Sequence, residues 1–504
     1  MSSPDQKSLN IQSDAAPVFK FIELSVDLLI NVIKFLPPCD IVSVRQTCRR
    51  LLSVTRLRTV WVNALHGVMQ DYSITEDTFP LQTMSVPLLE HSALSPYRLV
   101  SLLERSDNSR IEPASIRVLS PRLTNQEKAF HGILHSGELY DMFLAPGGRY
   151  LSTVAHYGGV SSILTVWDLG HSGNDGVKAL TRLVQPMTPH CSLINFFPDL
   201  PRRGIFYLVS KREAHSPQGI VVDVHTITIS PAFSTFVSVS KIWIPAMGPT
   251  DYYDVFASPE LQRITVRTDD TVKNRFLIWD FIHNTAAAWI APDCPIRPEL
   301  VFFSYKDSLV VGVRDKVLIY NIPPFVPFDS EIAPRHLEAS LSLSSPFPTP
   351  GFFFICQDCR PSSQASQYIC AANSEKIAVY KVNNTHSSGN PAVPNKLPTI
   401  AASVNAAYPS FAVDNIDSFT RMEHSIGHLF LGCSNDELGT FKVYMFKIAD
   451  RPNRQWNIKP SWASLFYDPT MALHRSQFYP LTGRMCLLTQ NRKLHILDFL
   501  VPPD

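Results

Sequence analysis

The sequence has few charged residues, and its positive and negative charges balance. Charged residues make up 18% of the 504 residues, below the quarter that is usual in globular proteins. The chain carries 45 Lys and Arg against 44 Asp and Glu, so no overall field would attract nucleic acid or an anionic membrane. We therefore expect no nucleic acid and no membrane among the partners of this protein.

Cysteines and long apolar runs are also scarce. The nine cysteines are odd in number and irregularly spaced, which excludes a disulfide framework and suits a reducing compartment. The N-terminus has no apolar core of a secretion signal, and no run approaches the 18 apolar residues of a membrane-spanning helix. We expect a protein of the cytoplasm, the nucleus or both.

Recognisable catalytic motifs are missing as well. The sequence contains no nucleophile elbow, no phosphate-binding loop and no dinucleotide fingerprint. Cys356 and Cys359 form a single C-x-x-C with Cys370 nearby, but a zinc site needs four ligands. His424 and His428 are four residues apart in a loop-like region, without the glutamate of a zinc-protease helix. We expect no catalytic residue, no metal and no cofactor.

Proline is abundant, and short strand-like segments recur along most of the chain. Proline accounts for 40 residues, which favours turns and strand edges over helices. From about residue 111 onward, seven segments read as strands that end on an aromatic residue or an aspartate: 164–168, 219–223, 276–280, 317–320, 377–380, 441–444 and 494–498. Their ends recur on average every 55 residues or so between positions 167 and 497. This length fits one four-stranded propeller blade, and closing several such repeats into a ring protects the sheet edges.

The segment 20–65 has a helical pattern instead. Apolar residues from Leu24 to Leu36 share one side of a helix that Ser25 would cap and Pro37 would end. Asp40 is the expected N-cap of a second helix that carries Ile41, Val44, Cys48, Leu51 and Leu52, and Trp61 follows in a third, short one. Two or three short helices cannot bury this much apolar surface by themselves. We therefore expect a partner to cover part of it.

The segment 24–51 resembles the F-box family in both spacing and residue type. The matching residues are Leu28-Leu29, Leu36-Pro37, Asp40-Ile41, Cys48-Arg49-Arg50 and the downstream Trp61, whereas Ser25 stands where the family usually has proline. The resemblance implies a partner, the Skp-type adaptor of cullin–RING ubiquitin ligases, and through it the cullin. By position, the residues implied to bind the adaptor are Leu24, Leu28, Leu29, Ile33, Leu36, Pro37, Ile41, Val44, Cys48 and Trp61.

The region after residue 111 resembles WD-repeat propellers more distantly. Only Trp167-Asp168 and Trp279-Asp280 show the Trp-Asp pair, and we expect both tryptophans to pack in the core. The predicted fold is mainly β: a small helical F-box followed by a β-propeller, with seven blades preferred over six or eight. The expected divisions are a disordered segment 1–19, the F-box domain 20–65, a connector 66–110 in which a helix starts near Ser95-Pro96, and the propeller 111–504.

Three hypotheses for function remain. The first is a non-catalytic adaptor whose F-box binds the Skp-type protein and whose propeller binds an unidentified substrate protein for ubiquitination. The second is a propeller-based enzyme, and the third is an F-box scaffold without a role in degradation. Arginines between 45 and 58 could bind an acidic surface or form a solvated helix face. Arg202-Arg203 and Lys211-Arg212 could bind a phosphorylated segment or lie in solvated loops.

Overall fold

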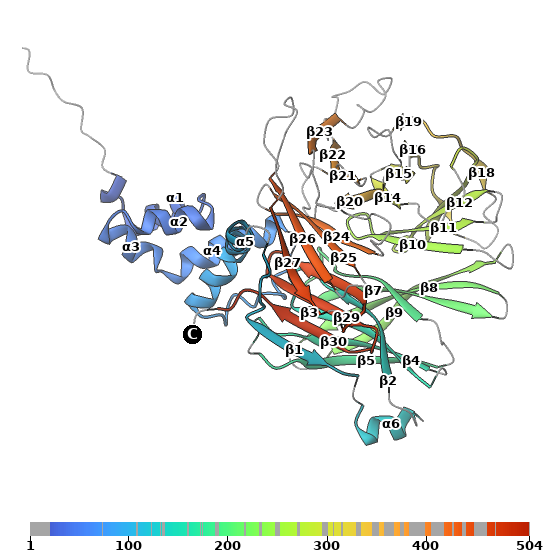
Figure 1. The fold of residues 1–504 in the computed structure, drawn as a ribbon, viewed down its shortest axis with the longest axis horizontal. Helices are drawn as coiled ribbons and strands as arrows, with labels where there is room; N and C mark the ends of the chain where they lie inside the picture. The colour runs from blue at the N-terminus through green and yellow to red at the C-terminus, as the bar shows by residue number, and fades with distance from the viewer. Residues whose placement is uncertain are drawn as a thin grey trace, which may run out of the picture.

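The computed structural model joins a helical N-terminal part to a ring of antiparallel sheets (Figure 1). It describes residues 21–502 apart from 73, 107–108, 122, 132, 134–136, 159–160, 172, 174, 187–190, 216–217, 231–233, 247–251, 270–272, 295–300, 306, 314–315, 329–333, 345–351, 357–366, 373–376, 383–398, 405–417, 426–427, 436–439, 448–460 and 469. The segment predicted to be disordered and Cys359 therefore lie outside the described residues.

Five helices and one 3₁₀ turn build the N-terminal part. They are η1 (Phe21–Glu23), α1 (Val26–Ile33), α2 (Pro38–Arg45), α3 (Arg49–Thr55), α4 (Arg58–Asp71) and α5 (Val86–Ser106). Ser25 caps α1 as predicted, because its hydroxyl accepts a hydrogen bond from the Leu28 amide at 3.4 Å. The boundaries of the predicted domains stay predictions.

Three helix predictions need correction. The second helix starts at Pro38, not after Asp40, because proline at the first helical position loses no hydrogen bond. The predicted continuous helix is two helices, since Cys48 has an extended backbone between α2 and α3. The connector helix begins at Val86 and contains Pro96 in its interior, where packing overrides the usual break at proline.

The β region consists of four-stranded antiparallel groups. In chain order these are β2 (Gly137–Leu144), β3 (Tyr150–Tyr157), β4 (Ser161–Asp168), β5 (Lys178–Pro186); β6 (Cys191–Pro198), β7 (Ile205–His215), β8 (Gln218–Ile229), β9 (Ser234–Pro245); β10 (Tyr252–Ser258), β11 (Arg263–Asp269), β12 (Asn274–Asp280), β13 (Thr285–Ala291); β14 (Val301–Tyr305), β15 (Ser308–Val313), β16 (Lys316–Asn321), β19 (Leu341–Ser344); β20 (Phe352–Cys356), β21 (Gln367–Ala372), β22 (Ile377–Val382), β23 (Thr399–Val404); β24 (Ser418–Ser425), β25 (His428–Asn435), β26 (Thr440–Lys447), β27 (Ser461–Tyr467); and β28 (Leu473–Tyr479), β29 (Arg484–Thr489), β30 (Leu494–Asp498) with β1 (Ser115–Leu119). The strands predicted from the sequence are the third strand of each group in chain order. His424 and His428, predicted in a loop, lie instead on the hairpin β24–β25.

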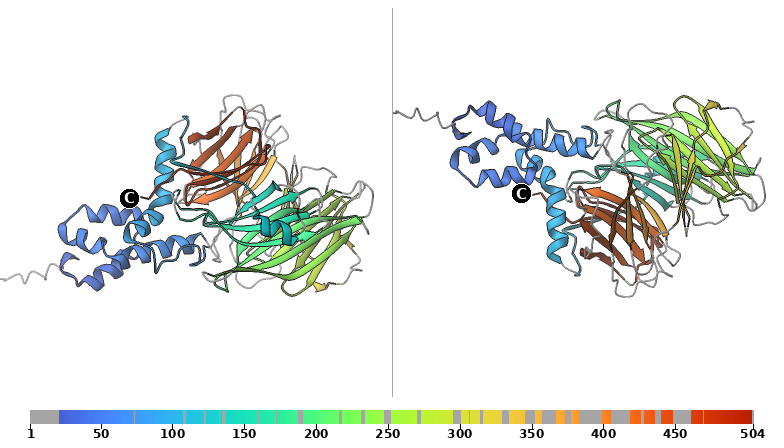
Figure 2. Two further views of the ribbon diagram at one scale, coloured as in Figure 1. Left: turned by 90° about the horizontal axis from the view of Figure 1, so that it is seen from below. Right: turned by 90° about the horizontal axis from the view of Figure 1, so that it is seen from above.

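The groups are arranged as a β-propeller, and we call each group a blade. The first strands of successive groups contact one another in a closed circuit, β2–β6–β10–β14–β20–β24–β28 and back to β2. A parallel bridge joins β20 to β24, so two groups form one eight-stranded sheet. The number of blades, with seven preferred, stays a prediction. Figure 2 shows the N-terminal helices to one side of the ring.

Polar side chains at strand bulges link neighbouring blades. The bulge after Leu139 places Asp141 so that it accepts hydrogen bonds from the Leu193 amide of the next blade at 2.7 Å and from Arg475 of the preceding blade. Asn195, after the bulge in β6, donates to the Ala257 carbonyl of the blade beyond at 3.4 Å. Because these groups are buried or partly buried, the bonds select one register between blades.

Segments of this chain also cover the outer edge of one blade. Strand β13 pairs antiparallel with β17 (Val326–Pro327) and parallel with β18 (Arg335–His336). The insertion after β16 thus hydrogen-bonds to the backbone groups of the outer strand β13. Unpaired, these groups could form a sheet with another chain.

Strand β9 passes very close to Gly219 of β8, and a substitution at this glycine tests that contact. A Cβ atom at this glycine would meet the Ile244 carbonyl oxygen at 2.2 Å, and a backbone atom cannot move away cheaply. We expect Gly219→Ala to lower the free energy of unfolding by about 1–3 kcal/mol. Gly176, with nothing within 4 Å of its Cβ position, supplies the control variant Gly176→Ala. Urea denaturation that shows equal stability for the two variants would contradict the close approach of β9 to Gly219.

Candidate protein-docking surface

The F-box helices have an apolar core of their own. Leu29 and Ile33 of α1, Ile41 of α2 and Trp61 of α4 are almost completely buried. The Trp61 indole nitrogen donates to the Thr55 carbonyl at 2.8 Å, which ties α4 to the end of α3. These contacts fix the helices relative to one another.

Several arginines between 45 and 58 stabilise this part of the chain internally. Arg45 stacks over Trp61 at 5.3 Å and forms a paired hydrogen bond with Glu90 of α5, at 2.8 and 2.9 Å. Arg58 donates to the carbonyls of the segment 81–84. Arg49 and Arg56 remain exposed, at a spacing of seven residues. Arg45 and Arg58 therefore fit neither interpretation of the arginine run, and both interpretations stay open for Arg49 and Arg56.

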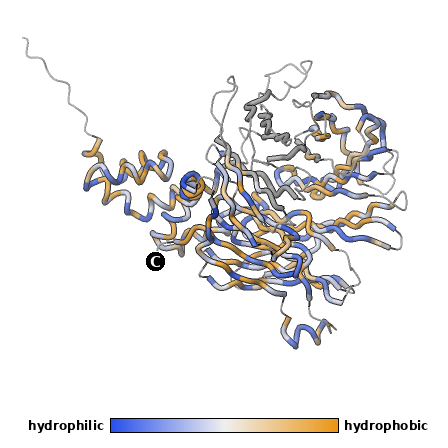
Figure 3. The backbone as a smooth tube through the Cα atoms, viewed as in Figure 1, coloured by the Kyte–Doolittle hydropathy of each residue, from blue (hydrophilic) through white to orange (hydrophobic). Residues whose placement is uncertain are grey.

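An apolar stripe faces outward on the same helices. Leu28, Val32 and Phe35 are spaced by four and three residues, and their exposed fractions are 51%, 42% and 81%. At 3.6 residues per turn this spacing places them on one side of α1 and its C-terminal extension. We call these three residues the outer stripe. Phe21, Ile22 and Val26 are also exposed, and Figure 3 shows hydrophobic segments along these helices.

The structure divides the predicted adaptor-binding residues into three sets. Leu28 and Pro37 are exposed; Leu24, Leu36, Val44 and Cys48 are half-buried; Leu29, Ile33, Ile41 and Trp61 are buried. Direct contact with the adaptor stays a prediction for all ten residues, and the buried set lies in the internal core of the helices. The buried residues hold the helices that present the others.

Sequence reasoning missed part of the exposed surface, although a signal for it was present. Val32 and Phe35 are large, exposed apolar residues on a face of the helix next to the one that buries Leu29 and Ile33. A helix whose apolar surface is wider than one buried face indicates two partners, here the internal core and a second surface. A helical-wheel projection of this segment would have added Val32 and Phe35 to the predicted adaptor-binding residues.

The helices and the propeller share continuous apolar cores. One cluster runs from α1 through Phe79 and Met84 of the connector to β2, β3 and β4. A second packs Leu99 and Leu103 of α5 against strands β25–β29. Asp77 adds polar links, since its carbonyl accepts from Tyr150 at 3.1 Å and its carboxylate from the Gly204 amide. The outer stripe is therefore held in a defined orientation to the ring.

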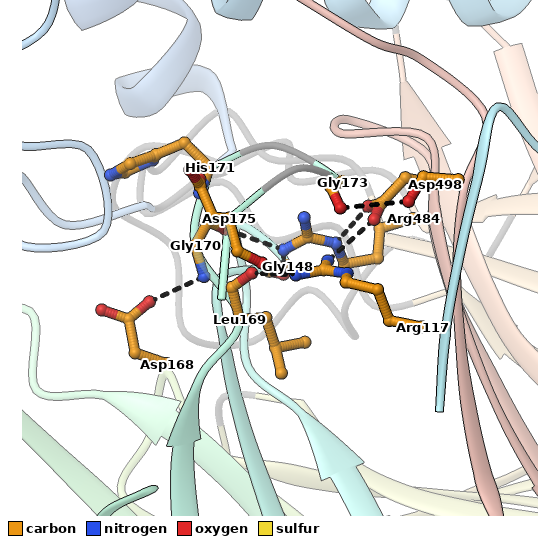
Figure 4. A network of polar contacts seen from close by, with 11 residues as sticks. Arg117, Gly148, Asp168, Leu169, Gly170, His171, Gly173, Asp175, Arg484 and Asp498 are labelled. Atoms are coloured by element: carbon orange, nitrogen blue, oxygen red, sulfur yellow. Dashed lines mark hydrogen bonds and ion pairs between the residues drawn. The ribbon is translucent and has the colours of Figure 1, made fainter. Parts of the chain in front are cut away.

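A buried polar network lies next to this junction, where the ring closes (Figure 4). Asp498 on β30 accepts from Arg484 at 2.5 Å and from Arg117 on β1 at 2.8 Å. Arg117 also donates to the carbonyls of Leu169 and Asp175, and Arg484 donates to those of Gly148 and Gly170. The two guanidinium groups thus join the N-terminal and C-terminal strands of one blade to the loops of another.

A buried histidine, His91, is expected to make the stability of the helical part sensitive to acid. Burial, followed by the nearby charge of Arg98, lowers the pKa of His91 on α5 from 6.5 to about 4. The unfolded chain therefore binds the proton more readily, and stability is lost as pH falls from about 6.5 and levels off near pH 4. We expect this histidine to account for up to about 3 kcal/mol. In urea denaturation at pH 7.5, 6.0 and 5.0, the free energy of unfolding of His91→Gln should fall less with pH than that of the wild type. An equal fall in both proteins would mean that His91 is not the group responsible.

The other residues singled out from the sequence have structural roles. Trp167 is buried and donates to Thr153 at 2.8 Å, and Trp279 is buried and donates to Asn284 at 3.2 Å, so the predicted core packing is confirmed. The basic pairs all have partners within the chain: Arg202 with Asp199, Arg203 with Glu76, Lys211 with the Tyr253 carbonyl, and Arg212 with Asp223. These contacts disfavour the phosphate-binding interpretation of both pairs.

The described part of the chain contains no group of three or more His, Cys, Asp or Glu side chains placed to hold a metal ion. None of its helices combines the length and the apolarity that crossing a bilayer requires.

Comparison with protein families identifies the helical part. The sequence pattern of the F-box domain family matches residues 21–63, the segment that carries the internal core and the outer stripe. Residues 21–63 are an F-box domain. No curated protein matches the sequence of this F-box protein.

Solved structures resemble the chain only distantly. A chain of the Polycomb Repressive Complex 2 of Chaetomium thermophilum bound to GSK126 is 11% identical, with 78% of this chain and 99% of that chain covered and a TM-score of 0.46. A crystal structure of the Polycomb Repressive Complex 2 of Chaetomium thermophilum contains a chain that is 11% identical, with 78% of this chain and 98% of that chain covered and a TM-score of 0.47. The WD40 domain of SCAP from fission yeast is 12% identical, with 72% and 82% covered and a TM-score of 0.37. The assignment of the propeller rests on the chain's own sheets.

Proposed function

We propose that this F-box protein is the substrate-recognition subunit of a Skp–cullin–F-box ubiquitin ligase. The outer stripe carries the proposal: an F-box with its own buried core still exposes Leu28, Val32 and Phe35 together. Exposed apolar patches of this kind mark protein interaction sites. The Skp-type adaptor would cover the stripe and link the chain to the cullin.

The shared cores explain how such a subunit would act without catalytic groups of its own. They hold the propeller in a fixed orientation to the F-box, so a protein bound to the propeller would be held near the ubiquitin carrier. Catalysis would come from this proximity. We place the assembly in the cytoplasm or nucleus, consistent with the free thiols of Cys191, Cys294 and Cys486.

Co-expression with a Skp-type adaptor tests the first half of the proposal. We expect the two chains to elute together in size-exclusion chromatography. A folded chain that fails to bind the adaptor would refute the proposal, and the propeller would then have to be examined for a function of its own, including an enzymatic one.

Proteasome inhibition tests the second half. Proteins captured by the chain in cells should become more abundant when the proteasome is blocked, and a variant that cannot bind the adaptor should remove this increase. If captured proteins do not respond, the chain is a scaffold and not a degradation subunit.

A further inference from the structure

A cluster of aromatic and basic side chains lies on the propeller, away from the F-box. Tyr140 on β2 and His156 on β3 are near the end of their hairpin opposite the turn 145–149. That turn faces the connector, because Arg149 donates to the carbonyls of Asp77 and Thr78 at 3.2 Å. His474 at the start of β28 and Arg492 in the β29–β30 turn complete the cluster. We call these four residues the distal cluster.

Stacking holds the distal cluster in place. The rings of Tyr140 and His156 are 4.4 Å apart and inclined by only 19°. The Arg492 guanidinium lies 5.4 Å from the Tyr140 ring, and the His474 ring is 5.8 Å from it. Arg492 also has a positive φ of 61°, which is uncommon for a residue with a side chain. The guanidinium of Arg492 thus lies against the Tyr140 ring.

Arg492 differs from Arg117, Arg149 and Arg484 in having no carboxylate partner among the described residues. Arg117 and Arg484 bind Asp498, and Arg149 binds Asp168. Within the described part of the chain, Arg492 forms no ion pair, and its Nη1 atom is buried without a hydrogen-bond partner. A buried nitrogen of a guanidinium without a hydrogen-bond acceptor is unfavourable, so a bound anion that supplies the acceptor would be stabilised.

The charges around the cluster favour an anion. Lys493 is exposed beside Arg492, and Arg475 is paired with the buried Asp141. The carboxylate of Glu138 is exposed on the strand position opposite His156. Burial and the charge of Arg492 lower the pKa of His474, as expected in a positive local potential.

We propose that the distal cluster binds an anionic side chain of a protein segment, with Arg492 as its charged donor and Tyr140 as its apolar wall. The inference rests on the proposed function, since it places substrate contact on the propeller. Carboxylate and phosphate groups share the required chemistry: both accept two parallel hydrogen bonds from a guanidinium.

The test measures peptide binding to the full chain in complex with a Skp-type adaptor. The probes are fluorescent peptides of eight residues rich in glutamate, the same design with phosphoserine, and an uncharged serine version, read by fluorescence anisotropy. Arg492→Gln removes the charge, whereas Arg492→Lys keeps it without the planar fork. Arg335→Gln removes one exposed charge on β18 and is the matched control.

The expected result is that at least one anionic peptide binds and the uncharged one does not. Arg492→Gln should weaken binding about tenfold or more and Arg492→Lys should weaken it less, while Arg335→Gln leaves it unchanged. The glutamate and phosphoserine arms show which anion is preferred.

Two outcomes would overturn the inference: no anionic peptide binds, or Arg492→Gln and Arg335→Gln weaken binding equally. Binding of the Skp-type adaptor is measured on the same samples. If the chain binds the adaptor but no anionic peptide, the inference fails while the proposed function stands. Thermal melting of Arg492→Gln shows that any loss is not unfolding.

Discussion

Asp498→Ala is expected to lower the free energy of unfolding by about 3–5 kcal/mol, because it leaves two buried guanidinium groups without their carboxylate. Arg117 and Arg484 both donate to Asp498, and the side chain of Arg484 is only 3% exposed. Removing one partner of a buried ion pair costs far more than the pair contributes, since the remaining charge stays away from water. Chemical denaturation followed by tryptophan fluorescence measures the loss.

Two variants show whether the loss comes from the buried charges. Glu112→Ala removes a carboxylate that is exposed and paired with Arg110, and it should change stability by less than about 0.5 kcal/mol. Adding Arg484→Met to Asp498→Ala should recover part of the loss, because one unpaired charge is removed. A loss below about 1 kcal/mol for Asp498→Ala would mean that the network does not close the ring.

Leu28→Asp is expected to reduce adaptor binding at least a hundredfold while leaving the free chain folded. A carboxylate transferred from water into an apolar interface costs several kcal/mol. In the free chain, half of the Leu28 side chain is exposed, so the stability should change by about 0.5 kcal/mol or less. Binding is measured by calorimetry with the purified adaptor, and folding by thermal melting.

Phe130 supplies the matched control for this variant. It is 84% exposed on α6 (Asn125–His131), a helix of the propeller region that lies outside the F-box. Phe130→Asp therefore introduces the same charge at an apolar residue that is even more exposed than Leu28. If Phe130→Asp also abolished binding, or Leu28→Asp bound normally, the outer stripe would not be the adaptor surface. Leu29→Asp would be uninformative, because Leu29 is buried in the core.

The periodic patterns of the sequence predicted the elements with the strongest local signal. Segments such as 164–168 and 276–280 are apolar runs with a Trp-Asp end, and they are the buried third strands of their blades. The edge strands escaped prediction because one side of them is solvated; β9 exposes Val237 and Val239 among polar residues. Burial between neighbours, more than local preference, makes such segments strands.

The site was harder to predict than the fold for a physical reason. Leu28 and Leu29 are adjacent and chemically identical, yet one is half exposed and the other fully buried. Periodicity reports that a helix has apolar sides, but tertiary packing decides which side is internal. The role of Arg492 depends likewise on Tyr140, more than 350 residues earlier in the chain. No local pattern records such a contact.

The pairing of β1 with β30 has a consequence for how the protein is made. The carboxylate of Asp498 and the guanidinium of Arg117 come from positions 381 residues apart, so a ribosome must add nearly the whole β region before the two strands can meet. At about 5–20 residues per second this takes roughly 20–80 s. Throughout that time Ile116 and Val118, exposed even in the finished protein, sit on an unpaired strand that can associate with other chains. A chain whose synthesis stops early would contain the F-box but no closed ring. We therefore expect chaperones to bind the newly made protein until β30 has been synthesised and has paired with β1.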